Sequence, residues 1–269
     1  MILLLLSSTF NSFSQNILIG FDNSSAIPPS PSKPELKDAL SASQRGENLN
    51  VLYRNESSFG ILAHSNGFGA NYRRGKHITA KKKGILEVEF VTMRHPKEVK
   101  IKNQSYQNSK GFFYGKVNSL FLIRPGVGYQ KVLFDKAERK SVQIRLGTFL
   151  GASLGFAKPV YLEILQPSIF PGEFNVKEEK YNSTEHYPDN IYGRAPYLRG
   201  FDEMKIYPGG YAKLALSVEY ADHNEEIKAI ETGISVDVFP KTIPIMALTQ
   251  NNQVMVNLYV SMVFGKKWF

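Results

Sequence analysis

The chain has 269 residues, no cysteine and a formal net charge of +9. The lack of cysteine excludes a disulfide framework, a thiolate metal site and a cysteine nucleophile. A hydrophobic share of 42% is ordinary for a chain that buries a core. The positive charge suits nucleic acid, anionic lipid and lipopolysaccharide equally, so charge alone selects no partner.

Residues 1–14 have the composition of a secretory signal peptide. Residues 2–6 are all Ile or Leu, and the small residues Ser12 and Ser14 form a cleavage site before Gln15. The basic segment that usually opens such a signal is missing, which indicates either an atypical signal or a start codon assigned too late. No stretch approaches the ~20 apolar residues that a spanning helix needs.

Residues 15–56 are predicted to form a periplasmic tail without regular structure. The segment from Ala26 to Pro34 is rich in proline and serine, which excludes a helix and an interior strand. The alternative is a poorly ordered terminus without a role.

From residue 57 onward the chain consists of strands and turns. Polar and apolar residues alternate cleanly over 141–156, 211–221, 227–239 and 253–264, and less regularly over 59–74, 85–94, 112–123 and 128–134. The glycines and the Asn66-Gly67 pair indicate a bend or bulge in the first of these strands. The prediction is an all-β fold, an antiparallel up-and-down transmembrane β-barrel of eight strands over residues 57–269.

The last strand has one wholly apolar face. This face is expected to contact lipid and consists of Val254, Val256, Leu258, Val260, Met262 and Phe264. Asn257, Tyr259 and Ser261 lie on the other face. A strand of this kind before a terminal aromatic, Phe269, resembles the last strand of bacterial outer-membrane barrels, in which the terminal aromatic belongs to the insertion signal.

The connections predict which end of the barrel faces the periplasm. Short turns at 136–139 and 222–225 suit the periplasmic side, and the long segment 158–208 suits the outside. By the same count residues 93–110 fall on the periplasmic side, where a long connection is unusual.

The polar face distinguishes a membrane barrel from the alternative, a soluble sandwich or lipocalin-like barrel. A soluble barrel should carry many lysines and glutamates outside, whereas this face carries Gly, Ser, Gln and Tyr with isolated charges. Those charges nearly cancel, and in a narrow eight-stranded barrel they should pair and fill the lumen. The predicted lumen network is Glu87, Glu89, Lys116, Arg124, Arg145, Lys213, Glu219, Glu231 and Asp237.

Basic residues outside this network cluster around the first hairpin. If that hairpin points outward they could bind lipopolysaccharide phosphates, and otherwise they form an interfacial anchor. The candidates are Arg73, Arg74, Lys76, Lys81, Lys82 and Lys83.

Motifs for catalysis, cofactors or metals are not found, and the histidines are scattered. His64 and Ser65 would suit a lipid-modifying pair, but neighbouring strand residues point to opposite faces and cannot act together without a bulge. We therefore predict a protein that is not an enzyme and has no cofactor.

Several segments resemble uncharacterised small outer-membrane barrels of Bacteroidota, namely 65–75, 114–118, 122–129 and 158–161, together with a signal ending in Ser-Gln. The resemblance implies a structural or accessory subunit of an envelope assembly, such as secretion or barrel-insertion machinery, in the outer membrane of a Gram-negative bacterium. Its partners would be the bilayer, lipopolysaccharide and envelope proteins, without nucleic acid. The alternative function is a small porin or specific transporter, and a less favoured one is a lipid-modifying enzyme.

Overall fold

The structure is a computed structural model that describes residues 54–79, 81–106, 109–135, 142–168, 174–221 and 225–268. All of them belong to one unit, Asn50–Phe269. The predicted signal segment, most of the predicted tail, Phe269, the turn at 136–139 and most of the turn at 222–225 lie outside the described residues.

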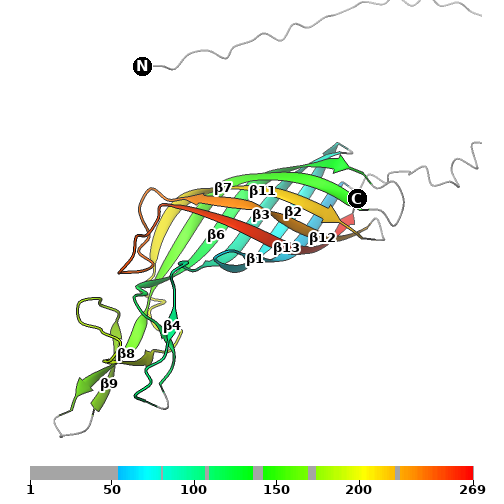
Figure 1. Ribbon diagram of the computed structural model, residues 1–269. Coiled ribbons are helices and arrows are strands. Elements are labelled where there is room, and N and C mark those ends of the chain that lie inside the picture. Colours follow the sequence, from blue (N-terminus) through cyan, green and yellow to red (C-terminus); the bar gives the residue numbers. More distant parts are fainter. Residues whose placement is uncertain are drawn as a thin grey trace, which may run out of the picture. The chain divides into compact units, whose positions relative to one another are not determined.

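Eight long strands form a closed antiparallel barrel (Figure 1). Their order around the ring is β1-β13-β12-β11-β7-β6-β3-β2, and β2 pairs again with β1. The strands are β1 (Asn55–His64), β2 (Gly67–Thr79), β3 (Lys82–Met93), β6 (Asn118–Phe134), β7 (Gln143–Pro159), β11 (Lys205–Glu219), β12 (Glu226–Val238) and β13 (Val254–Trp268). Closure removes the open strand edges, and the predicted fold class and strand number are confirmed.

Three of the predicted strands differ from the structure, in two errors that compensate in the count. The predicted strand 59–74 is a hairpin of β1 and β2, because His64 pairs with Gly67 across the two-residue turn Ser65-Asn66. The bend or bulge predicted from the Asn66-Gly67 pair is therefore a hairpin turn, which an Asn-Gly pair between apolar runs also indicates. Conversely, the predicted strands 112–123 and 128–134 are largely one strand, β6, which continues through Pro125 and Gly126.

The prediction of two strands in place of β6 also puts one connection at the wrong end of the barrel. Asn55 pairs with Trp268, so both ends of the described barrel lie at the end where the connections 80–81, 135–142 and 220–225 lie. The connections 65–66, 94–117, 160–204 and 239–253 lie at the other end. The expectation that 93–110 lies on the side of the short turns is wrong. Counted back from the C-terminus, the predicted strands 128–134 and 112–123 add a reversal that the single strand β6 does not have.

The wall of the barrel has two different faces, as β13 illustrates. The six predicted lipid-facing residues from Val254 to Phe264 are 46–64% exposed, whereas Asn257, Tyr259 and Ser261 are at most 4% exposed. The other strands add exposed apolar residues to this outward belt, including Ile61, Leu86, Val127, Leu150, Leu214 and Ile234.

The described residues include no helix that is long and apolar enough to cross a membrane.

Two of the connections, 94–117 and 160–204, fold together into what we call the rim extension. It contains two small sheets, β10-β8-β9 and β4-β5. Their bounds are β4 (Lys100–Ile101), β5 (Phe112–Phe113), β8 (Tyr161–Pro167), β9 (Phe174–Lys180) and β10 (Ile191–Arg194). Its buried core is formed by Phe112, Leu162, Ile164, Tyr181 and Ile191. The rim extension is therefore a folded element with a core of its own.

Asn103 fastens the two connections of the rim extension to each other. Its side-chain amide donates to the carbonyl of Ile191 at 2.9 Å and its Oδ1 accepts from the backbone N–H of Ser105 at 3.0 Å. A buried amide with both groups bonded holds its segment in one position.

Candidate functional site

The middle of the barrel interior contains a connected set of ion pairs. Arg73 on β2 donates from both terminal nitrogens to the two oxygens of Glu231 on β12, at 2.6 Å each, and from Nε to Glu87 on β3. Tyr259 donates its hydroxyl to Glu231 at 2.9 Å. All of these side chains are buried.

Two further cations extend this set. Lys213 on β11 donates to Glu87 at 2.5 Å and to Glu89 at 2.8 Å. Arg124 on β6 donates to Glu89 at 2.6 Å and holds both oxygens of Asp237, at 2.9 and 2.5 Å. Glu87 and Glu89 thus join the three cations into one network.

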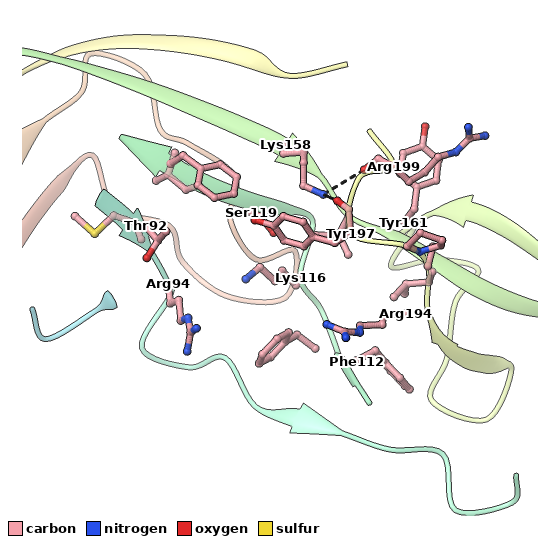
Figure 2. Close-up of a pocket in the computed structure, with 18 of the residues that line it drawn as sticks. Thr92, Arg94, Phe112, Lys116, Ser119, Lys158, Tyr161, Arg194, Tyr197 and Arg199 are labelled. Atoms are coloured by element: carbon pink, nitrogen blue, oxygen red, sulfur yellow. Dashed lines mark hydrogen bonds between the residues drawn. The ribbon is translucent and has the colours of Figure 1, made fainter. Parts of the chain in front are cut away.

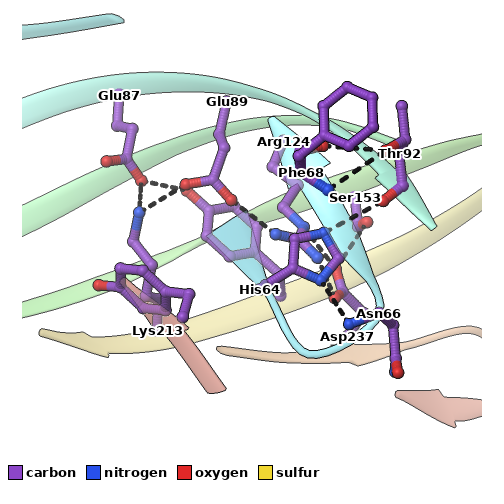
Figure 3. Close-up of polar contacts among 12 residues, drawn as sticks. His64, Asn66, Phe68, Glu87, Glu89, Thr92, Arg124, Ser153, Lys213 and Asp237 are labelled. Carbon is purple, nitrogen blue, oxygen red and sulfur yellow. Dashed lines mark hydrogen bonds and ion pairs between the residues drawn. The ribbon is translucent and has the colours of Figure 1, made fainter. Parts of the chain in front are cut away.

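The network crosses the barrel. In the ring of strands, two others separate β2 from β12, β6 from β12 and β3 from β11. Figure 3 shows Lys213 between Glu87 and Glu89, and Arg124 beside Asp237, where Ser153 adds a hydrogen bond of 3.0 Å. Because a buried charge without a partner is costly, a network in which each member is bonded holds opposite walls together.

A second cluster lies nearer the end with the short turns. Lys83 binds Glu56 at 2.5 Å, and Glu219 binds both Arg145 at 2.9 Å and Lys267 at 2.6 Å. A cavity of about 20 Å³ lies among these residues, which is room for about one water molecule.

The net charges of the two clusters cancel. The middle network has three cations and four carboxylates and a charge of −1, whereas the second cluster has three cations and two carboxylates and a charge of +1, so the sum is zero. The described part of the interior therefore carries no net charge from these residues.

The end of the interior near the rim extension is closed by apolar side chains. The connection between β12 and β13 contributes Ile243, Ile245 and Met246, which pack on inward residues such as Leu122 and Val91. Its backbone is held in place because Val117 N donates to Ile245 O at 2.9 Å and Ala247 N donates to Gly115 O at 2.8 Å.

Glycines make room for bulky side chains inside the wall. A Cβ on Gly126 would overlap the ring of Tyr211, and one on Gly128 would overlap Phe149. Ion pairs, aromatic rings and the apolar side chains around Ile243 together fill the described interior.

The structure brings together eight of the nine residues of the predicted lumen network, in the two clusters. The exception is Lys116, which lies beyond the strands of the barrel and binds Glu98 at 2.8 Å. It was misplaced because β6 begins only at Asn118. Sequence reasoning missed Glu56 and Lys267, which lie near the strand ends.

Of the six predicted lipopolysaccharide contacts, two lie inside the barrel and four lie on its surface. The expectation is wrong for Arg73 and Lys83, which are 4% and 6% exposed and ion-paired inside the barrel. The remaining four residues are exposed but lie at the end with the short turns, opposite the rim extension: Arg74, Lys76, Lys81 and Lys82. Had Asn66-Gly67 been assigned to a hairpin turn, the alternation along β2 would have placed Arg73 inside.

His64 and Ser65 make separate contacts. The ring of His64 bonds to the carbonyl of Thr92 at 3.1 Å and to the backbone N–H of Asn66 at 3.3 Å. Ser65 donates its hydroxyl to Asn257 at 3.4 Å. Both ring nitrogens of His64 thus serve to hold the first turn.

Outside the wall, a groove lies where the barrel meets the rim extension. This rim groove has a volume of about 330 Å³. Phe68, Thr92, Ser119 and Phe121 line it from the outward face of β2, β3 and β6, while Arg194, Pro196 and Tyr197 line it from the rim extension. It therefore begins where the outward apolar belt ends.

Five cations line the rim groove, and none of its described lining residues is Asp or Glu. They are Arg94, Lys116, Lys158, Arg194 and Arg199. Figure 2 shows the Lys116 amine and the Arg194 guanidinium among the side chains that line the groove. Lys158 donates to the carbonyls of Tyr197 at 2.7 Å and Arg199 at 3.2 Å.

Beside the groove, Tyr161 belongs to a small polar cluster. Its hydroxyl donates to Glu203 at 2.7 Å, and this bond raises the pKa of Tyr161. The hydrogen bond from Lys180 holds the pKa of Glu203 below its usual range. Glu203 is thus paired outside the groove. Of the groove cations, Lys116 is paired with Glu98 and Arg199 with Glu178, whereas Arg94 and Arg194 have no ion-pair partner among the described residues.

No protein-family model matches the chain, and neither does any curated protein. Among solved structures, the chain is similar to the Neisserial surface protein A, at 11% identity and a TM-score of 0.39, over 80% of this chain and 96% of that one. It is also similar to Ail, the attachment invasion locus protein of Yersinia pestis, solved alone and with the heparin analogue sucrose octasulfate. For both of these structures the identity is 8% and the TM-score 0.36, over 80% of this chain and 97% of that one. These neighbours are small eight-stranded outer-membrane barrels, and the likeness concerns the fold alone. The attribution to Bacteroidota stays a prediction.

Proposed function

We propose that this chain is a non-enzymatic outer-membrane barrel of a Gram-negative bacterium that serves as an accessory or structural subunit and holds a protein partner at its rim extension. The observation that carries the proposal is a closed ring of strands with an apolar outer belt around an interior filled by paired charges. In water the exposed apolar belt would be unfavourable, whereas in a bilayer it contacts lipid.

The orientation follows from the connections. Short turns belong to the periplasmic side of such barrels and long connections to the outside. The rim extension would then face the cell exterior, and the end that carries Asn55 and Trp268 would face the periplasm.

The filled interior supports a closed barrel over the alternative of a porin. Ion pairs cross the lumen between β2 and β12 and between β6 and β12, and the apolar residues around Ile243 close the end near the rim extension. A barrel whose described interior is filled in this way would act through its surface.

The strand β9 offers such a surface. Among the described residues it pairs only with β8, and Phe174 and Val176 on it are 56% and 51% exposed. An open strand edge is a template for adding a strand from a partner.

The position of Val176 makes this edge testable. Val176 pairs with Leu165, which donates its N–H in the other direction, to Asn190 O at 2.9 Å. The two residues therefore form a non-hydrogen-bonded pair, and the N–H of Val176 points to the open edge. A proline at this position removes an edge donor while the β8–β9 ladder keeps its bonds.

The test is affinity purification of the tagged chain from native envelopes in mild detergent. We expect proteins that co-purify with the wild type to be lost from Val176→Pro and kept by Val176→Thr, which retains the N–H. Equal recovery with all three chains would contradict the role of β9.

Planar-bilayer recordings test the closed interior. The purified wild type should insert without a steady current. A sustained open conductance would favour the porin.

A further inference from the structure

The rim groove has the chemistry of an anion site. Arg94 and Arg194 are exposed, and neither takes part in any of the ion pairs among the described residues. Lys116 and Lys158 are 7% and 4% exposed at the groove wall, where Lys116 is paired with Glu98 and Lys158 donates to backbone carbonyls. With several cations and no carboxylate in the lining, an anionic group would gain from charge complementarity there.

The position of the rim groove indicates that its ligand is also apolar. Phe68 is 57% exposed on the outward face of β2. Phe121 stacks on Phe90 of β3, with ring centroids 6.2 Å apart, and Phe90 is 47% exposed on the belt. A molecule with an anionic head in the groove would therefore place its tail along the outward apolar face.

The size of the groove fits the head of such a molecule. Its volume of about 330 Å³ lies at the lower end of the range for small-molecule pockets, ~300–1,000 Å³. This accommodates a phosphate with an attached polar group, while acyl chains would remain in the bilayer.

We propose that the rim groove binds the phosphate-bearing head group of an anionic membrane lipid, whose acyl chains lie against the outward face of β2, β3 and β6. The inference rests on the proposed function, because it requires the barrel to lie in a bilayer. It places the lipid contact at the opposite end from the cluster of Arg74, Lys76, Lys81 and Lys82. Aromatic rings beside cations are typical of the boundary between hydrocarbon and head groups.

The experiment is native mass spectrometry of the full chain in non-ionic detergent, titrated with phosphatidic acid and, in parallel, with phosphatidylcholine of the same acyl length. The wild type should prefer phosphatidic acid. The variant Arg94→Ala/Arg194→Ala should lose about 30-fold in affinity, since each cation near a membrane surface contributes about 1 kcal/mol. The matched control, Lys81→Ala/Lys82→Ala, removes two exposed cations at the other end and should bind as the wild type does.

Three outcomes would overturn the inference. The first is a wild type without preference for phosphatidic acid, and the second is an equal loss in the two double variants. The third is displacement of phosphatidic acid by an equal concentration of inorganic phosphate, which would make the groove a site for the free anion and not for a lipid.

Insertion into phosphatidylcholine vesicles separates this inference from the proposed function. Both double variants should insert as the wild type does, since the altered side chains are exposed. If the wild type itself does not insert, the proposed membrane barrel fails, and the lipid site fails with it. If it inserts and shows no anionic preference, only the lipid site fails.

Discussion

Replacement of Arg124 by methionine tests whether paired charges hold the barrel together. Arg124 is 2% exposed, binds both oxygens of Asp237 and donates to Glu89. Without it, Asp237 keeps the hydroxyl of Ser153, and Glu89 keeps Lys213. The charge of the middle network changes from −1 to −2 in a buried space.

We expect Arg124→Met to lower the free energy of unfolding by about 3–5 kcal/mol, the usual cost of removing one partner from a buried pair. This corresponds to roughly two to four orders of magnitude in the folding equilibrium. The double variant Arg124→Met/Asp237→Leu restores the charge of −1 and should recover most of the loss, because a buried ion pair can be replaced by apolar groups at little cost.

The assay is urea unfolding of the protein in lipid vesicles, followed by the fluorescence of Trp268, the single tryptophan of the chain. Lys228→Met is the matched control, since it removes one member of an exposed ion pair with Glu226 and should cost no more than about 1 kcal/mol. The reasoning is refuted if Arg124→Met unfolds like this control, or if the double variant is as unstable as the single one.

Two further predictions concern the outer belt and the rim extension. Val260→Arg places a charge on the outward face of β13, where Val260 is 53% exposed, and should destabilise the protein by about 2–4 kcal/mol in vesicles. The control Lys266→Arg, at an exposed position that already carries a charge, should leave stability unchanged. If Val260→Arg is tolerated, the outward face does not contact lipid. Burial raises the pKa of Tyr181 from 10.0 to about 12, so its contribution to the stability of the rim extension is complete below pH 10 and is lost as the pH rises through 12. The absorbance titration of the wild type minus that of Tyr181→Phe should have its midpoint near pH 12, and a midpoint near 10 would mean that Tyr181 is not buried.

The alternation of residues along the chain was enough to predict most of the strands and the two faces of the wall. Side-chain alternation is a property of a single strand, so Val254 to Phe264 could be placed outside and Asn257, Tyr259 and Ser261 inside without knowledge of any neighbour. The same parity selected Glu87, Glu89, Arg124, Lys213, Glu231 and Asp237 as interior charges. The predicted strand number followed from the same alternation, although two boundary errors compensated.

Where the chain reverses and which charges meet depend on the closed barrel and not on the pattern of any one strand. A single hairpin turn at Ser65-Asn66 turns Arg73 into the barrel, and the single strand β6 fixes the end to which residues 94–117 belong. Arg73 meets Glu231 although 158 residues separate them, because closure of the ring sets the register between strands that are distant in sequence. The core of the rim extension and the groove beneath it depend on two connections that fold onto each other. Neither connection carries a periodic pattern from which that contact could be predicted.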